Sequence, residues 1–457
     1  MKTKIILCLC SLCVLLASCT QSVVIKTEIP ARQAGQEHVL NLSVAPIDTV
    51  RVGMIGLGMR GIEAVRRFPH IPGVEISAIC DLREECIEKA QKIMAKFNLP
   101  KANEYKGEEG WKELCQQEDL DLIYICTDWL SHTPIALYAM DCGKHVAIEV
   151  PAALNMEEIW ALIDKAEQSR LHCMMLENCI YDFFELTSLE MAQKGVFGEL
   201  IHAEGAYIHN LDPFWEKYWN NWRLAYNQDH RGDVYPTHGI GPICLALNIH
   251  RGDRMKTLVS MDTKPLNGKK IMEKVSGKAC ESFVNADQTN TLIQTELGKT
   301  MLIEHNVLTP RPYSRMYQLV GTDGFANKYP TKQYCLREEV KGEINAREIL
   351  EEKVYMNEEL KALQAEYTSP ILTEELEKSA KEVGGHGGMD FIMDYRLIYC
   401  LQHGLPLDMD VYDLAEWCCL APLTKLSLEN DNRPVEIPDF TRGAWNVVEG
   451  YKFAVSK

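Results

Sequence analysis

One short run restricts the fold of this chain more than any other feature. Gly56-Leu57-Gly58-Met59-Arg60-Gly61 has the spacing G-x-G-x-x-G, follows the apolar run Val50–Ile55 and precedes a helix-like stretch from Ile62. Glycine permits a tight turn at the first position, close approach of the backbone to a pyrophosphate at the second, and close helix–strand packing at the third. The run therefore predicts a strand, a phosphate-binding turn and a helix whose N-terminus faces the phosphates.

A carboxylate at the end of the next predicted strand indicates which dinucleotide binds. Asp81 ends the run Val74–Asp81, twenty residues after Gly61. A carboxylate at this place accepts hydrogen bonds from the adenosine ribose hydroxyls and repels a 2′-phosphate. We therefore expect NAD rather than NADP, with contacts from Gly56, Gly58, Gly61 and Asp81. A glycine turn in some other α/β protein is the alternative.

The alternation of apolar runs and helix-like stretches continues beyond Asp81. Strands are predicted at 121–127, 145–151 and 173–178, with helices at 134–142 and 156–169 between them. This order is typical of a doubly wound parallel sheet, so we predict an α/β protein with a Rossmann domain at 49–178. Trp129 to His132, and Glu149 with Val150, follow strand ends, where such sheets bind ligands. A helix cap and a packing group are the plainer interpretation of Trp129 and His132.

Beyond residue 178 the pattern changes, and a second domain is predicted at 179–457. Polar-aromatic clusters appear here, among them Tyr235-Pro236-Thr237-His238. Helical stretches at Phe391–His403 and Val411–Glu429 are expected to pack back near the nucleotide domain. The strand-like segments suit an open, largely antiparallel sheet behind a substrate face, and they are Leu200–Tyr207, Lys256–Met261, Ser282–Val284, Thr289–Thr295, Thr300–Val307 and Met316–Gly321.

The amino terminus has the pattern of an exported lipoprotein. A basic start precedes an apolar run at 5–17, too short to span a bilayer, and the run ends in Leu16-Ala17-Ser18-Cys19, which resembles a bacterial lipoprotein cleavage box. We predict a signal peptide at 1–18, a lipid on Cys19 and a tether at 19–48. The body would then be held at a membrane of the cell envelope, on its periplasmic or surface side. An ordinary signal peptide is the alternative.

Charge and cysteine usage exclude some classes of partner and cofactor. The formal net charge is −17, and an acidic, evenly mixed surface argues against nucleic acid as a partner. Thirteen of the 17 cysteines lie beyond Cys19, without a CxxC pair or the His/Cys spacing of a zinc site. We expect them to be small buried hydrophobes and predict neither a metal site nor a disulfide framework.

The order of elements resembles the Gfo/Idh/MocA oxidoreductase family, in which a Rossmann domain precedes an open-sheet α/β domain. That family usually carries Glu-Lys-Pro at the end of the fifth strand, whereas this chain has Glu149-Val150-Pro151, which disfavours an ordinary polyol dehydrogenase. From Val50 to Trp445 the chain more closely resembles glycoside hydrolase family 109, the NAD-dependent α-N-acetylgalactosaminidases. The shared motifs are the Gly-Met-Arg-Gly turn, Leu-Glu-Asn, Trp-Arg, Tyr-Pro-Thr-His-Gly, Arg-Pro-Tyr, Gly-His-Gly-Gly-Met-Asp and Pro-Asp-Phe.

The resemblance implies a glycosidase that uses NAD. A two-carboxylate glycosidase needs an acid and a base or nucleophile beside the scissile bond, and no convincing pair stands in the motifs of the second domain. In the implied reaction, hydride removal from C3 of the sugar acidifies the proton on C2, and elimination at C1, water addition and hydride return follow. A sugar dehydrogenase with net redox turnover and a catalytically silent sugar-binding lipoprotein are the alternatives.

Four residues are predicted to do the acid–base work. His238 is the first choice because imidazole titrates near neutral pH, and its expected task is to deprotonate the C3 hydroxyl. Tyr235 shares that proton or hydrogen-bonds the sugar. Tyr181 is the candidate for the C2 proton, provided that a neighbouring cation lowers its pKa. Glu149 either orients the nicotinamide ribose or acts as a base itself.

The same resemblance implies the remaining contacts. The substrate is predicted to be a small molecule or glycan with an amino sugar, and Arg223 is expected to bind its acetamido carbonyl or a hydroxyl pair. The role of the loop Gly384–Asp390, the sugar, the anomer and a homo-oligomer stay open. NAD is expected to contact Met59, Arg60, Trp129, Leu130, Ser131, His132, Glu149, Val150 and Asn178. The sugar pocket is expected to contain Tyr207, Arg223, Tyr235, Pro236, Thr237, His238 and Tyr313.

Overall fold

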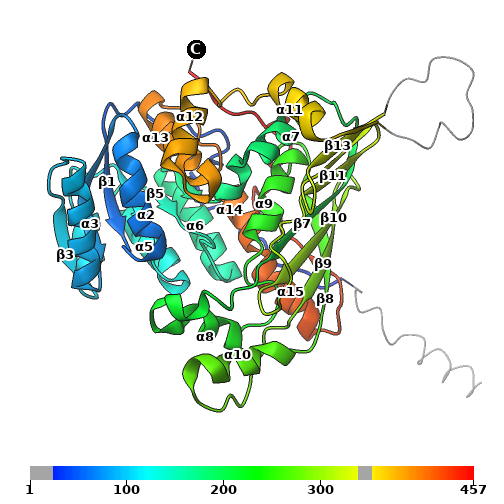
Figure 1. Cartoon of the computed structure of the whole chain (residues 1–457), viewed down its shortest axis with the longest axis horizontal. Coiled ribbons are helices and arrows are strands. Elements are labelled where there is room, and N and C mark those ends of the chain that lie inside the picture. Colours follow the sequence, from blue (N-terminus) through cyan, green and yellow to red (C-terminus); the bar gives the residue numbers. More distant parts are fainter. Residues whose placement is uncertain (1–23, 338–352, 457) are drawn as a thin grey trace, which may run out of the picture.

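The computed structural model describes residues 24–337 and 353–456. They form two β-sheets side by side, with the six-stranded sheet on the left of Figure 1 and the nine-stranded sheet on the right. The predicted signal peptide and Cys19 lie outside the described residues. In the part of the chain that is described, no helix is both long enough and apolar enough to cross a membrane.

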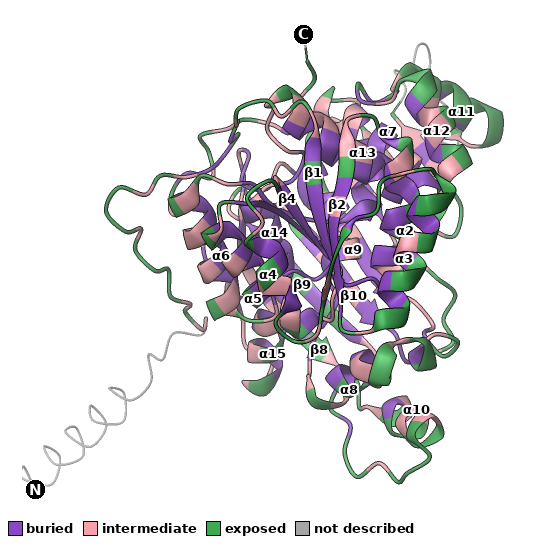
Figure 2. Ribbon diagram, turned by 90° about the vertical axis from the view of Figure 1, so that its left-hand side faces the viewer, coloured by how far each residue is buried: buried purple, intermediate pink, exposed green. Residues whose placement is uncertain are grey.

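The first sheet is a doubly wound parallel sheet, as predicted. Its order is β3-β2-β1-β4-β5-β6, and every neighbouring pair is parallel. Helices cover both faces, so β4 and β5 are buried throughout and β1 is buried except at Arg51 (Figure 2), and these strands have apolar sequences. Chain order reverses between β1 and β4, where such sheets bind ligands. The elements are β1 (Val50–Ile55), α2 (Met59–Arg67), β2 (Val74–Asp81), α3 (Glu84–Lys96), β3 (Asn103–Lys106), α4 (Gly110–Cys115), β4 (Leu122–Ile125), α5 (Trp129–Asp141), β5 (His145–Ile148), α6 (Met156–Ser169) and β6 (Cys173–Met175).

The second sheet is open and largely antiparallel, also as predicted. Its order is β14-β13-β12-β11-β7-β10-β9-β8-β15, and among the described strands β7 with β10 is the one parallel pair. The elements are α7 (Phe183–Gln193), β7 (Leu200–Ile208), α8 (Trp222–Asp229), α9 (Thr237–Ala246), β8 (Met255–Asp262), α10 (Leu266–Ser276), β9 (Thr289–Thr295), β10 (Thr300–Asn306), β11 (Gln318–Gly321), β12 (Gly324–Asn327), β13 (Gln333–Leu336), β14 (Lys353–Tyr355), α11 (Asn357–Glu366), α12 (Glu374–Val383), α13 (Met389–His403), α14 (Val411–Cys418), α15 (Leu420–Glu429) and β15 (Val435–Glu436).

One predicted strand of this second domain is wrong. The segment Ser282–Val284 is not a strand, because Phe283 turns inward onto Gly268 of α10 and the residues pair with no sheet neighbour among the described strands. The helical stretch predicted at Val411–Glu429 is confirmed, with a break at Cys419 between α14 and α15. Pro422, near the start of α15, lacks the N–H that would continue the helical hydrogen bonding.

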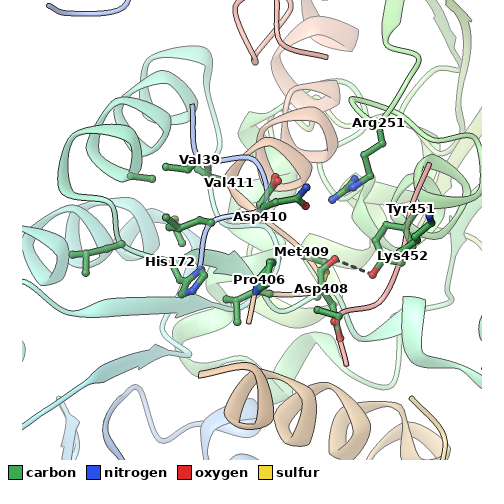
Figure 3. Close-up of a pocket in the computed structure, with 17 residues that line it drawn as sticks. Val39, His172, Arg251, Pro406, Asp408, Met409, Asp410, Val411, Tyr451 and Lys452 are labelled. Atoms are coloured by element: carbon green, nitrogen blue, oxygen red, sulfur yellow. Dashed lines mark hydrogen bonds between the residues drawn. The ribbon is translucent and has the colours of Figure 1, made fainter. Parts of the chain in front are cut away.

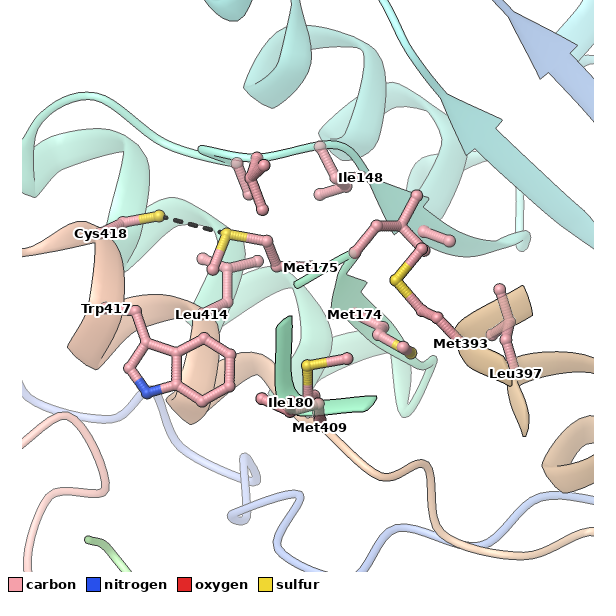
Figure 4. Packing of buried hydrophobic residues seen from close by; sticks show 14 of the residues in the cluster. Ile148, Met174, Met175, Ile180, Met393, Leu397, Met409, Leu414, Trp417 and Cys418 are labelled. Atoms are coloured by element: carbon pink, nitrogen blue, oxygen red, sulfur yellow. Dashed lines mark hydrogen bonds between the residues drawn. The ribbon is translucent and has the colours of Figure 1, made fainter. Parts of the chain in front are cut away.

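The last helices return to the nucleotide domain, as predicted. α14 packs on α6 and β6, and α13 packs on α2 and β1. Figure 4 shows one part of this junction, where Met174 and Met175 of β6 lie in a buried cluster with Met393 of α13 and Trp417 of α14. Methionine suits such a junction because its flexible side chain fills irregular gaps. The two sheets are therefore joined through a shared apolar core.

The segment predicted as a tether is packed wherever it is described. Ile25 forms a parallel bridge to Val435 of β15, and Val39, Leu40 and Leu42 belong to the buried core. The prediction of a tether is therefore wrong for residues 24–48, which hold fixed tertiary contacts. The sequence misses this because the segment has neither helix nor strand periodicity and docks through scattered side chains.

Both ends of the described chain meet at one buried carboxylate of the nucleotide domain. Glu167 on α6 accepts hydrogen bonds from Arg32, from Arg442 and from the hydroxyl of Tyr412 on α14. A small cavity of about 90 Å³ lies nearby, between the amino-terminal segment and the last residues. On its wall the Tyr451 hydroxyl donates to the carbonyl oxygen of Asp408 (Figure 3).

Candidate active site

The glycine turn has the shape that the sequence predicts. Gly56 has a φ of +87°, and a Cβ there would lie 2.6 Å from the backbone of Cys126. A Cβ on Gly61 would collide with the carbonyl oxygen of Gly56. At Gly58 the nearest atom to an added Cβ is a guanidinium nitrogen of Arg83 at 3.5 Å, so the backbone there stays open to a ligand. The turn thus offers free amides at the start of α2, a cradle that fits a pyrophosphate.

A cleft of about 660 Å³ opens in front of this turn. Its lining includes seven of the predicted cofactor contacts, which are Gly56, Gly58, Met59, Arg60, Asp81, Leu130 and Ser131. The sequence did not predict that the second domain also lines the cleft, through Lys217, Tyr218, Trp219 and Trp222. The cleft has the size expected for a cofactor site, so its residues fit the NAD that the sequence predicts.

Asp81 lies at the ribose end of the cleft and is held from both sides. Its Oδ2 accepts a hydrogen bond from the backbone N–H of Leu57 at 2.7 Å, and its Oδ1 accepts from the backbone N–H of Arg83 at 2.9 Å. The Arg83 guanidinium also lies 5.5 Å from the ring centroid of Trp219, within cation–π range. Arg83 therefore links the nucleotide domain to Lys217–Trp222, the segment of the second domain that covers the cleft.

Other predicted cofactor residues are buried beside the cleft, at the carboxyl ends of β4, β5 and β6. They are Trp129, His132, Glu149, Val150 and Asn178. His132 directs Nδ1 to the carbonyl of Pro151 (2.8 Å) and Nε2 to that of Thr127 (3.1 Å). Burial lowers its pKa, so the ring is neutral and donates to one of the two carbonyls. His132 thus holds the ends of β4 and β5 together, as in the plainer interpretation.

Arg60 is the hub of an ion network at the mouth of the cleft. Its Nε donates to Glu149 at 2.7 Å, and its Nη1 donates to Asp390 of α13 at 3.0 Å. Asp390 also accepts from Asn178 Nδ2 at 2.6 Å. Burial raises the pKa of Asp390, but the His386 hydrogen bond and the charge of Arg60 lower it further, so that the net pKa lies well below its usual range. The network links the two domains and joins three predicted cofactor residues, Arg60, Glu149 and Asn178.

His238 stands in the first turn of α9, oriented by a carboxylate that sequence reasoning missed. Its Nδ1 lies 2.7 Å from Oε1 of Glu177, and its Nε2 lies 3.3 Å from the hydroxyl of Tyr235. Burial raises the pKa of Glu177, but His238 lowers it more, leaving the pKa below its usual value. The carboxylate therefore fixes the Nδ1–H tautomer and leaves Nε2 to accept a proton.

Two glycines bring α9 against β7. A Cβ on Gly239 would lie 2.6 Å from the backbone nitrogen of Ala206, and one on Gly205 would collide with the carbonyl of Gly239. This close approach puts Tyr207 beside His238, with ring centroids 5.4 Å apart. Burial raises the pKa of Tyr207 to about 12, against the smaller lowering by Arg223. Tyr207 is therefore a neutral hydrogen-bonding group at neutral pH.

Arg223 lies at the centre of an aromatic enclosure. Its guanidinium carbon is 4.6 Å from the ring centroid of Tyr235, 5.0 Å from Trp129 and 5.8 Å from Tyr207. Nη1 donates to the hydroxyl of Tyr218 at 2.6 Å, whereas the buried Nε has no hydrogen-bond partner and no carboxylate pairs with the guanidinium in the described part of the chain. A buried cation with an unused donor is suited to bind an oxygen-rich ligand.

The other predicted pocket residues surround this centre unevenly. Tyr313 is 42% exposed and packs edge-on against His209, whose ring also contacts Tyr207. Pro236 and Thr237 are buried where α9 begins. The structure thus brings together Tyr207, Arg223, Tyr235 and His238. The structure also places His209 and Glu177 here. Of these two, only Glu177 belongs to a motif that the sequence analysis named, as the middle residue of Leu-Glu-Asn.

Tyr181 does not lie in this pocket, and its predicted role as a base is wrong. Its side chain is fully buried, and its hydroxyl donates to Asp408 at 2.9 Å. Burial and the charge of Asp408 raise its pKa well above the ordinary value, despite the nearby Arg396. Arg396, the neighbouring cation, is itself paired with Asp408. A tyrosinate is therefore disfavoured at this position.

The loop Gly384–Asp390 carries an exposed imidazole to the mouth of the site. Gly384, Gly385, Gly387 and Gly388 all have positive φ, which explains the glycine repeat. The His386 side chain is 58% exposed, and its Nδ1 lies 2.9 Å from Asp390. Burial and the charge of Arg223 lower the pKa of His209 most, and His238 and His386 lower it further. Nη1 of Arg60 lies 3.3 Å from Nδ1 of His386, which places this imidazole beside the ion network at the mouth of the cleft.

Two sequence families match the two domains. Residues 50–176 match the oxidoreductase family with an NAD-binding Rossmann fold. Residues 181–447 match the C-terminal domain of glycosyl hydrolase 109.

Curated relatives share this organisation over nearly the whole chain. A "Glycosyl hydrolase family 109 protein 1" of Bacteroides thetaiotaomicron is 62% identical over 437 residues, covering 95% of this chain and 93% of the relative. A family 109 protein of Porphyromonas gingivalis is 60% identical, with the same coverage.

Solved structures share the fold at low identity. A levoglucosan dehydrogenase in complex with NADH and L-sorbose has a TM-score of 0.65 at 16% identity, covering 86% of this chain and all of that one. A myo-inositol 2-dehydrogenase of Lactobacillus plantarum has a TM-score of 0.60 at 16% identity, with 85% and full coverage. These likenesses establish the fold of both domains.

Proposed function

We propose that this chain, which belongs to glycosyl hydrolase family 109, hydrolyses terminal α-linked N-acetylgalactosaminides by transient oxidation of the sugar at C3. The family makes it a glycosidase, and its Rossmann domain makes it an NAD-binding one. The sugar and the route are our inference. NAD, when bound, supplies a hydride acceptor and returns the hydride later in the same turnover.

The observation that carries the proposal is the enclosure of Arg223 beside the cofactor cleft. Trp129 forms its wall, and the next residues of α5, Leu130 and Ser131, line the cleft. A sugar on Arg223 would thus lie next to a cofactor in the cleft. The unpaired Nε of Arg223 suits the acetamido carbonyl, and the surrounding rings suit the apolar face of a pyranose.

His238 is the base for the oxidation step. Its Nε2 accepts the proton of the C3 hydroxyl as the hydride leaves C3, and the Glu177 carboxylate stabilises the imidazolium that forms. Tyr235 holds Nε2 in place before the sugar binds, since its hydroxyl lies 3.3 Å away. The same imidazolium returns the proton when C3 is reduced again.

The proton on C2 needs a second base, because Tyr181 is committed to Asp408. We assign this step to His386, whose Nε2 makes no hydrogen bond to the described residues and whose ring is half exposed at the mouth. Asp390 binds Nδ1 and so leaves Nε2 as the basic nitrogen. The glycine-rich backbone on both sides permits the ring to swing toward a bound sugar.

One assay separates the proposal from its alternatives. The purified protein is incubated with nitrophenyl α-N-acetylgalactosaminide in heavy water, without added nucleotide. Hydrolysis by the proposed route releases nitrophenol and places deuterium at C2. Accumulation of NADH would instead indicate a sugar dehydrogenase, and sugar binding without either signal would indicate a silent binding protein.

We also propose that Cys19 carries a lipid that holds the protein at a membrane of the cell envelope. The support is the sequence alone, a basic start and an apolar run that ends in Leu-Ala-Ser-Cys. Mass spectrometry of the amino-terminal peptide measures it directly. Cys19→Ser should move the protein from the membrane to the soluble fraction, and a wild-type chain found unmodified and soluble would contradict the proposal.

A further inference from the structure

The end of the molecule around α10 concentrates positive charge in an acidic protein. Residues 263–280 hold five lysines and one glutamate, a formal net charge of +4 in a chain of −17. In Figures 1 and 2, α10 projects at the lower end, opposite α11 and α12. The five lysines are Lys264, Lys269, Lys270, Lys274 and Lys278, all exposed, and none forms an ion pair with the described residues.

Exposed apolar side chains accompany these lysines. Leu266 is 65% exposed, and Met261, near the end of β8, is 64% exposed. Leu266, Lys270 and Lys274 follow one another at four-residue intervals, so they share one face of α10. An exposed face that combines lysines with large apolar residues is typical of a helix that lies at a lipid interface.

The opposite side of α10 is fixed to the body. Phe283 packs on Gly268, and Asp287 accepts the backbone N–H groups of Leu266 and Asn267 at the start of the helix. Ile271 is partly buried against the core. Because these contacts fix the helix, the lysine face has a defined direction relative to the rest of the molecule.

The described chain begins at the edge of the second sheet, beside β15. Ile25 runs parallel to β15 at Val435, and β15 runs antiparallel to β8, with Val435 opposite Leu258. At Ile25 the described chain therefore runs antiparallel to β8, so its first residues lie on the side of the carboxyl end of β8, from which α10 follows. Cys19 lies six residues before Ile25, a reach of about 20 Å at most.

We propose that this end, formed by α10 and the end of β8, lies on an anionic lipid surface and orients the enzyme body there. The proposal rests on the proposed lipid at Cys19, which brings a membrane within reach of this end. Lysines near a membrane are attracted to anionic headgroups, and a basic patch is the second signal that supplements a lipid anchor. Phosphate-bearing headgroups are thus the ligand that the exposed lysines would meet.

Lysine acetylation read by mass spectrometry tests the surface on the full chain. The chain is reconstituted on vesicles of phosphatidylcholine alone and on vesicles that also contain phosphatidylglycerol. We expect phosphatidylglycerol to reduce the labelling of Lys269, Lys270 and Lys274 several-fold. Labelling of Lys361 and Lys381, on α11 and α12 at the opposite end, should not change.

Charge variants give a second readout. Replacing Lys269, Lys270 and Lys274 by Gln should remove the preference for phosphatidylglycerol vesicles in flotation, whereas the matched replacement of Lys361, Lys378 and Lys381 should keep it.

The outcomes separate the surface from the anchor. Equal labelling on both vesicles, with a lipid found on Cys19, would overturn the proposed surface. Protection of the α10 lysines in a chain whose amino-terminal peptide carries no lipid would support the surface and overturn the anchor. Equal labelling on both vesicles in a chain whose amino-terminal peptide carries no lipid would overturn both proposals.

Discussion

The cofactor cleft and the sugar pocket adjoin at Trp129, yet they are built in opposite ways. The central residues of the cleft belong to one stretch, Val50–Asp81. At the glycine turn they offer backbone groups, rather than side chains, to a ligand. The charges of the cleft are paired, Asp81 with Arg83, and Arg60 with Glu149. The pocket collects side chains from the end of β6, from β7, α8 and α9, which are far apart in the sequence.

The pocket also keeps buried polar atoms that have no hydrogen-bond partner in the described chain. Arg223 has no carboxylate partner, and Asp233, which caps the turn before Tyr235, has a buried Oδ2 without a hydrogen bond. Buried, unsatisfied polar groups destabilise a fold. The cleft is therefore arranged for stability, whereas the pocket keeps hydrogen-bonding groups available for a substrate.

The largest effect expected of the pocket is on turnover. His238→Ala should lower kcat by about 10³-fold, because a positioned general base contributes on that order. NAD bound per chain, measured after denaturation, should stay at the wild-type level since His238 is not in the cleft. His202→Ala, on the outer part of β7, is the matched control. A turnover close to wild type would disprove the role of His238.

Asp233→Asn tests whether the pocket lowers stability. Burial raises the pKa of Asp233 to about 7, from 3.8. Between these values only the unfolded chain ionises, so the carboxyl lowers stability as pH rises and the full penalty stands above the folded pKa. The variant should therefore be more stable near pH 8 by up to about 4 kcal/mol, and nearly unchanged near pH 4.

Urea unfolding at several pH values measures this effect. Asp212→Asn, at an exposed position, should show no such trend. If Asp233→Asn gave the same change at every pH, the carboxyl would not be a buried, protonated group.

Arg223→Lys should weaken sugar binding while leaving the cleft intact. Lysine lacks the planar set of donors, so kcat/KM should fall by about 10²-fold, chiefly through KM. Binding of NAD, followed by titration, should change little. Arg254→Lys, at the sheet edge, serves as the control, and an equal loss of NAD binding would contradict the separation of the two sites.

Trp219→Ala should act on the cleft alone. Removing the ring takes away the cover and the contact with Arg83, so NAD should leave about 10-fold faster, in keeping with the ~1 kcal/mol of a partly exposed cation–π contact. Exchange against labelled NAD measures the rate. Trp445→Ala is the control for loss of a tryptophan, and a changed KM for the sugar would show that the covering segment serves the pocket instead.

Tyr181→Phe should have the smallest effect on activity. The variant loses one hydrogen bond to Asp408, so thermal unfolding should show a loss of about 1 kcal/mol, with kcat nearly unchanged. A strong fall in kcat at unchanged stability would restore the catalytic role that the sequence alone suggested.

The sequence also predicted the cleft more completely than the pocket. The cleft could be predicted because its turn, helix and acidic residue are contiguous, and local spacing determines their geometry. The open sheet and the returning helices were recognisable from hydrophobic periodicity. The covering segment Lys217–Trp222 was not, because its contact with the cleft is tertiary.

The turn Asn178–Tyr181 shows why the pocket was harder to predict. This single 3₁₀ turn and the residue before it send side chains in three directions. Glu177 reaches His238, Asn178 reaches Asp390 and Tyr181 reaches Asp408. Spacing along the chain does not distinguish these directions, so the sequence favours the tyrosine and does not indicate that the glutamate orients the base.

The buried carboxylate of Glu167 has a consequence for how the chain folds. Its partners Arg32 and Arg442 come from opposite ends of the described chain. Without Arg442, Glu167 keeps Arg32 and Tyr412 but loses one of its two cationic partners, which destabilises a buried carboxylate. The nucleotide domain therefore reaches its final stability only after Arg442 has been synthesised. Despite its two sheets, the protein should unfold in one cooperative transition, and chains truncated before Arg442 should be cleaved by proteases faster than the full chain.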